Sequence, residues 1–318
     1  MNLLDLVVRR RQPEAQGICS FELEAPDGGH LPAFTAGAHV DVHLGEGLVR
    51  QYSLCNDQRE RSRYRIAVLR DPASRGGSLL MHDWAVEGRP LRVGLPRNLF
   101  ALEANNPALL VAGGIGITPL LSMAYALSAK ATPWRMHCCA RSVSRQAFRE
   151  EILAGNMAGS VRFHTDDGSG GEPFDARTVL AAAAGDTHLY VCGPVGFMDH
   201  VLATARELGW SQERLHREYF AAPRTEAAAD GSFILRLARS GRELVVPAER
   251  TALQVLIESG IDVPYACESG VCGTCLTPVL EGTLDHRDAF LSDEERAANN
   301  QFTPCCSRAC SGTLVIDL

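Results

Sequence analysis

Four cysteines near the C-terminus carry the most specific chemical signal in the sequence. Cys267, Cys272 and Cys275 follow the spacing C-x4-C-x2-C, and Cys305 lies further along the chain. This spacing is typical of plant-type [2Fe–2S] sites, in which cysteine thiolates hold two irons. Such a cluster accepts one electron at a time. The segment therefore predicts one-electron transfer chemistry.

The residues between these cysteines support a cluster over a zinc ion. Gly270 and Gly273 suit a tight loop, because glycine adopts positive φ and brings backbone N–H groups close to sulfur. A structural zinc site is the alternative, but such sites usually combine two C-x2-C pairs and this segment has one. From the residues alone the fourth ligand stays open among Cys305, Cys306 and Cys310.

A short run near position 50 combines a cationic, an aromatic and a hydroxyl side chain. In the run RQYSL, strand alternation places Arg50, Tyr52 and Leu54 on one side and Ser53 on the other. A guanidinium matches phosphate oxygens, and an aromatic face suits a flat ring. The alternative is an amphipathic strand without a ligand.

A glycine turn follows at positions 74–78, with the sequence SRGGS. Its candidate residues are Arg75, Gly76, Gly77 and Ser78, and a helix is predicted from Leu79. Backbone N–H groups at such a helix start bind phosphate well. The alternative is a plain helix cap formed by Ser78.

A second glycine turn lies between a buried strand predicted at 108–112 and a helix predicted at 119–129. Backbone approach to a pyrophosphate would explain glycines at this place, although such turns also occur for packing alone. The candidate residues in the run GGIGITP are Gly113, Gly114, Gly116, Ile117, Thr118 and Pro119.

Two further strand ends complete the candidate set. Strands predicted at 134–139 and 187–192 end at Arg141 and at the run Cys192, Gly193 and Pro194. No Ser-His-Asp set or paired acid and base accompanies them. These strand ends therefore give no sign of a nucleophilic or acid–base catalytic set.

Taken together and in this order, the motifs resemble the phthalate dioxygenase reductase family, in particular its vanillate O-demethylase reductase-like members. These belong to the ferredoxin reductase superfamily and carry a C-terminal plant-type ferredoxin domain. The resemblance implies that Arg50 pairs with the flavin phosphate, that Tyr52 packs on the isoalloxazine ring and that Ser53 hydrogen-bonds near N5. FMN is favoured over FAD, because no aromatic-rich insertion that would hold an adenosine is visible.

The same resemblance assigns roles to the remaining candidates. Arg141 would lie at the adenosine ribose of NADH, with NADPH left open, and Cys192 would shape the hydride site beneath the nicotinamide. Phe220 in the run EYFA matches an aromatic that covers the flavin, although it could equally be core. The run CCSRA matches Cys305 to the family's fourth iron ligand.

The elements that must position these residues predict a multi-domain fold. Alternating short runs predict an antiparallel β-barrel flavin domain at 1–103, and strand, turn and helix patterns predict an α/β nucleotide-binding domain with a parallel sheet at 104–222. A linker is predicted at 223–231, and a C-terminal α+β (β-grasp) ferredoxin domain at 232–318.

The hypothesis that follows is an NADH-dependent oxidoreductase. Electrons pass from NADH through FMN to the [2Fe–2S] cluster and on to a Rieske-type terminal oxygenase, as the resemblance implies. An iron–sulfur redox sensor is one alternative, but it would not need both a flavin motif and GGIGITP. A stand-alone flavin oxidase is another, and it would not need the ferredoxin domain.

Composition limits the other function classes. A net charge of -7 and a pI of about 5.8 argue against nucleic-acid binding. The uncharged stretch 104–129 is interrupted by prolines and glycines, which argues against a membrane span. Eleven cysteines and no signal peptide predict a cytoplasmic protein without a disulfide framework.

Overall fold

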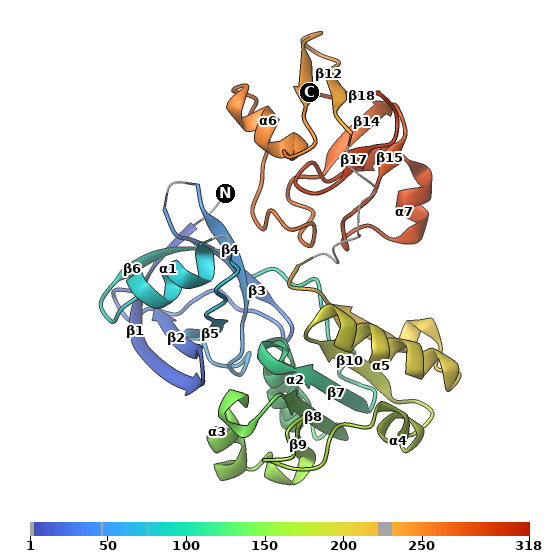
Figure 1. The fold of residues 1–318 in the computed structure, drawn as a ribbon. Helices are drawn as coiled ribbons and strands as arrows, with labels where there is room; N and C mark the ends of the chain where they lie inside the picture. The colour runs from blue at the N-terminus through green and yellow to red at the C-terminus, as the bar shows by residue number, and fades with distance from the viewer. Residues whose placement is uncertain (1–2, 46, 75, 222–230) are drawn as a thin grey trace. The chain divides into compact units, whose positions relative to one another are not determined.

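The chain divides into two compact units, Met1–Glu218 and Tyr219–Leu318, in a computed structural model (Figure 1). The structure describes residues 3–45, 47–74, 76–221 and 231–318. Most of the predicted linker, 223–230, lies outside the described residues. The boundaries given above for the three domains stay predictions. Among the described residues, no helix is both long and apolar enough to span a bilayer.

An antiparallel six-stranded sheet forms the first part of the N-terminal unit, in the order β4-β3-β6-β1-β2-β5. A bridge between Leu54, just after β4, and Ile66 in β5 joins the two edges, so the sheet closes into a barrel. Alternate residues such as Val8, Phe21 and Val40 fill its interior. The strands are β1 Leu3–Ala15, β2 Ile18–Glu24, β3 His39–His43, β4 Val49–Ser53, β5 Tyr64–Leu69 and β6 Pro90–Gly94.

One helix belongs to the barrel. Helix α1, Gly77–Trp84, follows β5 and buries Met81 in the barrel core. It begins two residues before the predicted start at Leu79. Because Gly76 is its N-cap residue in the left-handed conformation, with φ of 88°, the glycine turn and not Ser78 starts the helix.

A parallel five-stranded sheet forms the rest of the N-terminal unit, in the order β11-β10-β7-β8-β9. Three strands were predicted, and the structure adds two at the edges. The strands are β7 Ala108–Gly113, β8 Trp134–Ala140, β9 Val161–Thr165, β10 His188–Cys192 and β11 Leu215–Glu218. The helices are α2 Ile117–Ala129, α3 Arg149–Ala154, α4 Ala176–Ala181 and α5 Val195–Glu207.

The C-terminal unit has a mixed five-stranded sheet in the order β13-β12-β18-β14-β16, in which β12 and β18 are parallel. Helix α6 packs on it through Leu253 and Leu256 and starts with a capping box between Thr251 and Gln254. The strands are β12 Phe233–Leu237, β13 Glu243–Val246, β14 Thr277–Glu281, β15 Leu284–Asp285, β16 Gln301–Phe302, β17 Arg308–Ala309 and β18 Thr313–Ile316. The helices are α6 Ala252–Glu258 and α7 Asp293–Ala298.

Candidate functional site

Arg50 and the start of α1 form a cradle on the barrel. A methyl group placed on Gly77 would lie 2.5 Å from Arg50 Cγ and 2.9 Å from Arg50 Nε, so only glycine lets the guanidinium lie against this turn. Gly76, the N-cap residue, has no side chain to bond the first helix amides. A guanidinium beside uncapped N–H groups fits the phosphate of a flavin mononucleotide.

The other residues of the two flavin motifs have different surroundings. Tyr52 is partly buried against the barrel core, and burial raises the pKa of its hydroxyl above the usual value. Leu54 is fully buried and its N–H donates to the Ala38 carbonyl at 2.8 Å, so it is a core residue. The Ser78 hydroxyl accepts a hydrogen bond from the Asp71 N–H at 3.2 Å. Arg75 lies outside the described residues.

The Arg50 cradle yields a prediction about flavin affinity. Replacing Arg50 with methionine keeps an unbranched side-chain stem but removes the guanidinium and its charge-assisted bonds to phosphate. We expect FMN to bind more weakly by on the order of 10- to 100-fold. Fluorescence titration of the flavin-free protein with FMN measures this. Arg92→Met, which changes an exposed arginine on β6, is the control, and equal losses in both variants would contradict the cradle.

Ser53 lies at the end of β4 and contacts a residue that sequence reasoning did not assign. The Ser53 hydroxyl donates to Glu218 Oε2 at 3.3 Å, across 165 positions of sequence. Glu218 ends strand β11, and burial raises the pKa of its carboxyl to about 8, with Ser53 offsetting the shift in part. A serine predicted to contact the flavin therefore adjoins a carboxyl that is protonated near neutral pH.

This raised pKa predicts how stability depends on pH. The unfolded carboxyl titrates near its ordinary value of 4.5 and the folded one near 8, so the folded state holds the proton more tightly. Its contribution to stability is therefore fully present below about pH 4.5 and falls as pH rises toward 8. In Glu218→Gln this loss, on the order of 1–3 kcal/mol, should disappear.

Denaturant unfolding of the flavin-free protein at pH values from 5 to 9 checks this prediction. The difference in unfolding free energy between Glu218→Gln and the wild type should grow as pH rises. Glu213→Gln, which changes an exposed carboxylate upstream of the same strand, is the control. A constant difference across the range would mean that Glu218 does not titrate there.

The candidate nicotinamide residues meet at one edge of the parallel sheet. From β7 the chain moves outward through β8 and β9, then returns to the other side of β7 to form β10 and β11. The carboxyl ends of β7 and β10 thus flank a topological switch point, where open α/β sheets bind nucleotides. Gly113 and Gly114 lie at one of these ends and Cys192 and Gly193 at the other.

Two of the glycines in GGIGITP have a packing role. A methyl group on Gly116 would lie 2.2 Å from the Cys192 carbonyl oxygen, and one on Gly113 would lie 2.9 Å from Pro194 and Phe197. Gly114 differs, because it has a φ of 57° and no atom within 4 Å of the added methyl group. Approach to a ligand is therefore an explanation for Gly114, whereas Gly113 and Gly116 let the two strand ends meet.

The remaining nucleotide candidates divide by exposure. Ile117, Thr118 and Pro119 are buried in the first turn of α2, where they hold the helix against the sheet. Arg141 is exposed directly after β8, at the same edge as Gly114. Cys192 is fully buried and burial raises the pKa of its thiol well above the usual value, which disfavours the thiolate that a nucleophile needs. Its role in shaping the hydride site stays a prediction.

The four candidate iron ligands lie in the C-terminal unit as two neighbouring pairs. All four are buried, and Cys267 pairs with Cys272 while Cys275 pairs with Cys305. The hydrogen bond from Cys272 lowers the pKa of Cys267 to about 5. Among the described residues, no three metal-binding side chains gather around a single point. Two pairs suit a two-iron cluster with two thiolates for each iron better than one zinc ion.

The loop around these cysteines presents backbone N–H groups to sulfur. The Ser269 N–H donates to Cys267 Sγ and the Thr274 N–H to Cys272 Sγ, both at 3.4 Å. Glycines at positions 270 and 273 have φ values of 72° and 66°, as the sequence predicted for a tight curl. The donor set therefore fits a sulfur-bound cluster.

A segment that sequence reasoning missed packs on this loop. The Phe290 ring lies where a side chain on Gly273 would be, 2.3 Å from the added methyl group, and the Ala289 N–H donates to the Gly270 carbonyl at 2.8 Å. The buried Asp288 carboxylate accepts bonds from the Phe290 and Leu291 N–H groups and fixes this segment. No local motif marks it, because the contacts form only in the fold.

Two cysteines near the cluster loop and one aromatic complete the candidate set. The Cys306 thiol contacts Cys305 and the Thr303 hydroxyl beside the cluster loop. Cys310 is exposed to solvent. Phe220 is 40% exposed, so the alternative that it is an ordinary core residue is wrong. Its role beside the flavin stays a prediction.

Comparison with known proteins supports this organisation. Residues 235–310 match the 2Fe-2S iron-sulfur cluster binding domain family. The vanillate O-demethylase oxidoreductase of Pseudomonas sp. strain HR199 is 52% identical over 317 residues, which cover 99% of this chain and 100% of that protein. The phthalate dioxygenase reductase of Burkholderia cepacia is 41% identical over 319 residues and covers 99% and 97% of the two chains.

A solved structure agrees over the whole length. Phthalate dioxygenase reductase, described as a modular structure for electron transfer from pyridine nucleotides to [2Fe–2S], matches with a TM-score of 0.81. The two chains are 41% identical, and the match covers 100% of this chain and 98% of that one. The predicted fold class, with its antiparallel, parallel and ferredoxin parts, is confirmed.

The fold and the site define a class of protein, the flavin and iron–sulfur oxidoreductases with a barrel, a nucleotide-binding sheet and a C-terminal ferredoxin domain. Within that class, the chain belongs to the family of the phthalate dioxygenase reductases and vanillate O-demethylase oxidoreductases. The resemblance inferred from the sequence motifs is confirmed.

Proposed function

We propose that this protein is an NADH-dependent reductase that delivers single electrons to a Rieske-type oxygenase component, with FMN and a [2Fe–2S] cluster as its carriers. The main support for the proposal is the pairing of Cys267 with Cys272 and of Cys275 with Cys305. Two pairs of thiolates suit a [2Fe–2S] cluster, which transfers one electron at a time. When bound, flavin accepts electrons as a pair and releases them singly, and the cluster carries one at a time.

The residues of the N-terminal unit bind and orient the two nucleotides in this proposal. Arg50 holds the flavin phosphate with the N–H groups that follow Gly76, and Tyr52 packs on the ring. Ser53 bonds near the reacting nitrogen and is itself held by Glu218. These contacts fix the flavin before the pyridine nucleotide binds, which lowers the entropic cost of hydride transfer.

The switch point between β7 and β10 receives NADH. Gly114 offers its backbone to the pyrophosphate, and Arg141 lies at the end of β8, where it reaches the ribose. The buried Cys192 thiol, which stays protonated because its pKa is raised, presents a neutral surface to the nicotinamide. In the C-terminal unit, the N–H groups of Ser269 and Thr274 donate to two of the sulfurs that would hold the cluster and would favour negative charge there.

The acceptor is an oxygenase component that acts on a small aromatic compound. Support comes from the relatives, whose names place them with vanillate demethylation and phthalate oxygenation. We place the protein in the cytoplasm, because none of the eleven cysteines, all of which lie in the described residues, forms a disulfide, as expected in a reducing compartment.

Turnover of NADH tests the proposal against a stand-alone flavin oxidase. The purified protein should oxidise NADH slowly in air and much faster once cytochrome c is supplied as a one-electron acceptor. An oxygenase component of the vanillate or phthalate type should replace cytochrome c in this assay. Rapid NADH oxidation in air without any acceptor protein would favour the oxidase.

A further inference from the structure

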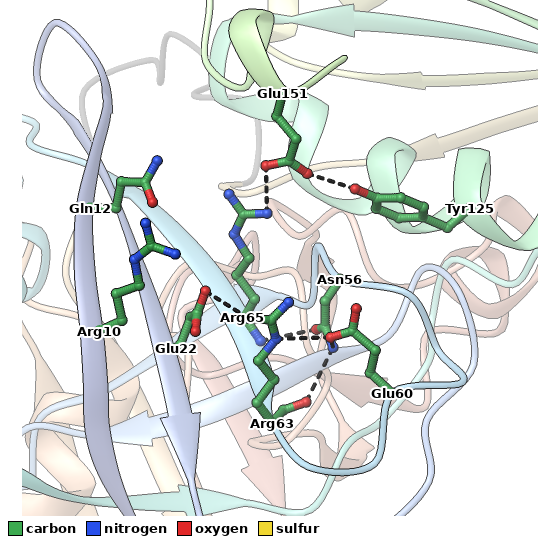
Figure 2. Close-up of a pocket in the computed structure, with 9 residues that line it drawn as sticks. All are labelled: Arg10, Gln12, Glu22, Asn56, Glu60, Arg63, Arg65, Tyr125 and Glu151. Carbon is green, nitrogen blue, oxygen red and sulfur yellow. Dashed lines mark hydrogen bonds and ion pairs between the residues drawn. The ribbon is translucent and has the colours of Figure 1, made fainter. Parts of the chain in front are cut away.

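An ionic cluster around the buried Arg65 lies where the barrel meets the α/β part of the N-terminal unit, and Figure 2 draws Arg65, Tyr125 and Glu151 from it. We call it the junction cluster, and it consists of Glu14, Arg65, Tyr125 and Glu151. Arg65 Nη2 bonds Glu14 Oε1 and Arg65 Nη1 bonds Glu151 Oε2, each at 2.8 Å. Tyr125 completes the cluster by donating its hydroxyl to Glu151 Oε1 at 2.6 Å. The cluster therefore joins two barrel residues to two helix residues.

The surroundings make this connection rigid. The side chains of Arg65 and Glu14 are only 9% and 5% exposed, and the Arg65 guanidinium lies over the Phe148 ring at 4.7 Å. Phe148 is buried directly before α3 with a φ of 60°, a conformation that tertiary packing must hold. Apolar residues of both parts, including Ala67 and Leu120, form one continuous core beside it. A guanidinium desolvated in this way has few alternative positions.

Arg65 is also connected to the flavin motif through its backbone. Its N–H donates to Asn56 Oδ1 at 2.9 Å, and its carbonyl accepts from the Cys55 N–H at 2.8 Å. Residues 55 and 56 directly continue the strand that presents Tyr52 and Ser53. The backbone of Arg65 thus fixes the flavin strand.

The side chain of Arg65 leads to the other nucleotide site. Through Glu151 it holds Tyr125, which lies two turns into α2. Helix α2 begins at Ile117, within the GGIGITP run that ends β7. One residue therefore links the strand at the flavin site to the helix that starts at the nicotinamide site.

Arg63 supplies a contrast within the same polar cavity, whose volume is about 310 Å³. Arg63 bonds Glu22 Oε1 and Glu60 Oε2, each at 2.9 Å, and both carboxylates belong to the barrel (Figure 2). It makes ion pairs as Arg65 does, but these pairs do not cross to the α/β part. Arg63 is therefore a matched control for ion pairing that does not join the two parts.

We propose that Arg65 is a positioning residue for hydride transfer, because it holds the nicotinamide-binding helix α2 at a fixed place relative to the flavin strand. This inference rests on the proposed function. Hydride transfer requires the two rings to approach within about 3–3.5 Å, and a shift of about 1 Å can cost on the order of 100-fold in rate. Electron transfer from flavin to cluster tolerates more movement, so hydride transfer is the step that Arg65 controls.

Anaerobic stopped-flow reduction by NADH tests the proposal in the holoprotein. In Arg65→Met, the limiting rate of flavin bleaching at saturating NADH should fall on the order of 10- to 100-fold, while the NADH concentration for half-saturation changes little. The long-wavelength charge-transfer absorbance between nicotinamide and flavin should weaken. Arg65→Lys should restore part of the rate, because an ammonium still pairs with one carboxylate.

The partner residues and the control make the test specific. Glu151→Gln should also lower the limiting rate, and adding it to Arg65→Met should cause little further loss, because the two residues form one connection. Arg63→Met should keep the wild-type rate. If Arg65→Met does not fold, the limiting rates of Glu151→Gln and Tyr125→Phe test the inference instead. The Glu151 side chain is 33% exposed, so we expect its replacement to be tolerated.

Two results would overturn the inference: an unchanged limiting rate in the Arg65 and Glu151 variants, or an equal fall in Arg63→Met. Amide hydrogen exchange distinguishes a failure of the Arg65 inference from a failure of the proposed function. Arg65→Met and Glu151→Gln should speed exchange in α2 and α3, and Arg63→Met should not. If wild-type flavin is not bleached by NADH, the proposed function fails, whatever the exchange of these helices shows.

Discussion

Replacing Cys272 with serine should leave NADH-driven reduction of a two-electron dye nearly intact and lower cytochrome c reduction by more than about 100-fold. Cys272 and Cys267 form one of the two thiol pairs, so this change removes one of the two thiolates predicted for one iron. The candidate flavin and nicotinamide residues other than Phe220 lie in the other compact unit and keep their contacts. The two assays therefore separate hydride transfer from one-electron output.

A second cysteine variant is the control for this prediction. Cys310 is exposed and lies outside both pairs, so Cys310→Ser should reduce both acceptors at the wild-type rate. Iron analysis and the visible spectrum show directly whether each variant holds its cluster. Equal loss of dye and cytochrome c reduction in Cys272→Ser would contradict the order of carriers.

Replacing Gly116 with alanine should destabilise the N-terminal unit by about 3 kcal/mol or more. The new methyl group would lie 2.2 Å from the Cys192 carbonyl oxygen, and a backbone carbonyl cannot rotate away as a side chain does. Because Gly116 has an ordinary helical φ of -61°, the cost is steric and not conformational. Denaturant unfolding of the purified protein measures it.

Gly114→Ala is the matched control for this clash. No atom lies within 4 Å of its added methyl group, so only its positive φ is penalised, by about 1–2 kcal/mol. We expect Gly114→Ala to weaken NADH binding more than stability and Gly116→Ala to do the reverse. A larger loss of stability in Gly114→Ala would mean that the approach of β7 to β10 is not as described.

The sequence predicted the elements that have apolar patterns of their own. The strands predicted at 108–112 and 187–192 match β7 and β10, because continuous apolar residues mark them. Strands β9 and β11 were missed. Both lie at the edges of the parallel sheet, and their sequences VRFHT and LHRE are largely polar, since an edge strand buries fewer side chains.

The candidate site was predictable where its chemistry lies in one short segment. Cysteine spacing and the glycine runs are local patterns, and the structure brings the cysteines together in pairs. Contacts between residues far apart in the sequence gave no such signal. Glu218 meets Ser53 across 165 positions, and Arg65 meets Glu151, which lies in another part of the N-terminal unit. Burial is the one cause that raises the pKa of the Glu218 carboxyl, and the residues next to Glu218 in the sequence do not reveal that burial.

Anaerobic titration of the purified protein with NADH tests the central claim most directly. Visible absorbance follows the flavin, EPR follows the cluster, and chromatography identifies the released flavin. The account predicts bleaching of the flavin, a rhombic [2Fe–2S] signal in the reduced protein, and release of FMN. A colourless protein containing zinc would contradict the account, and a yellow protein without the EPR signal would reduce it to a flavin reductase.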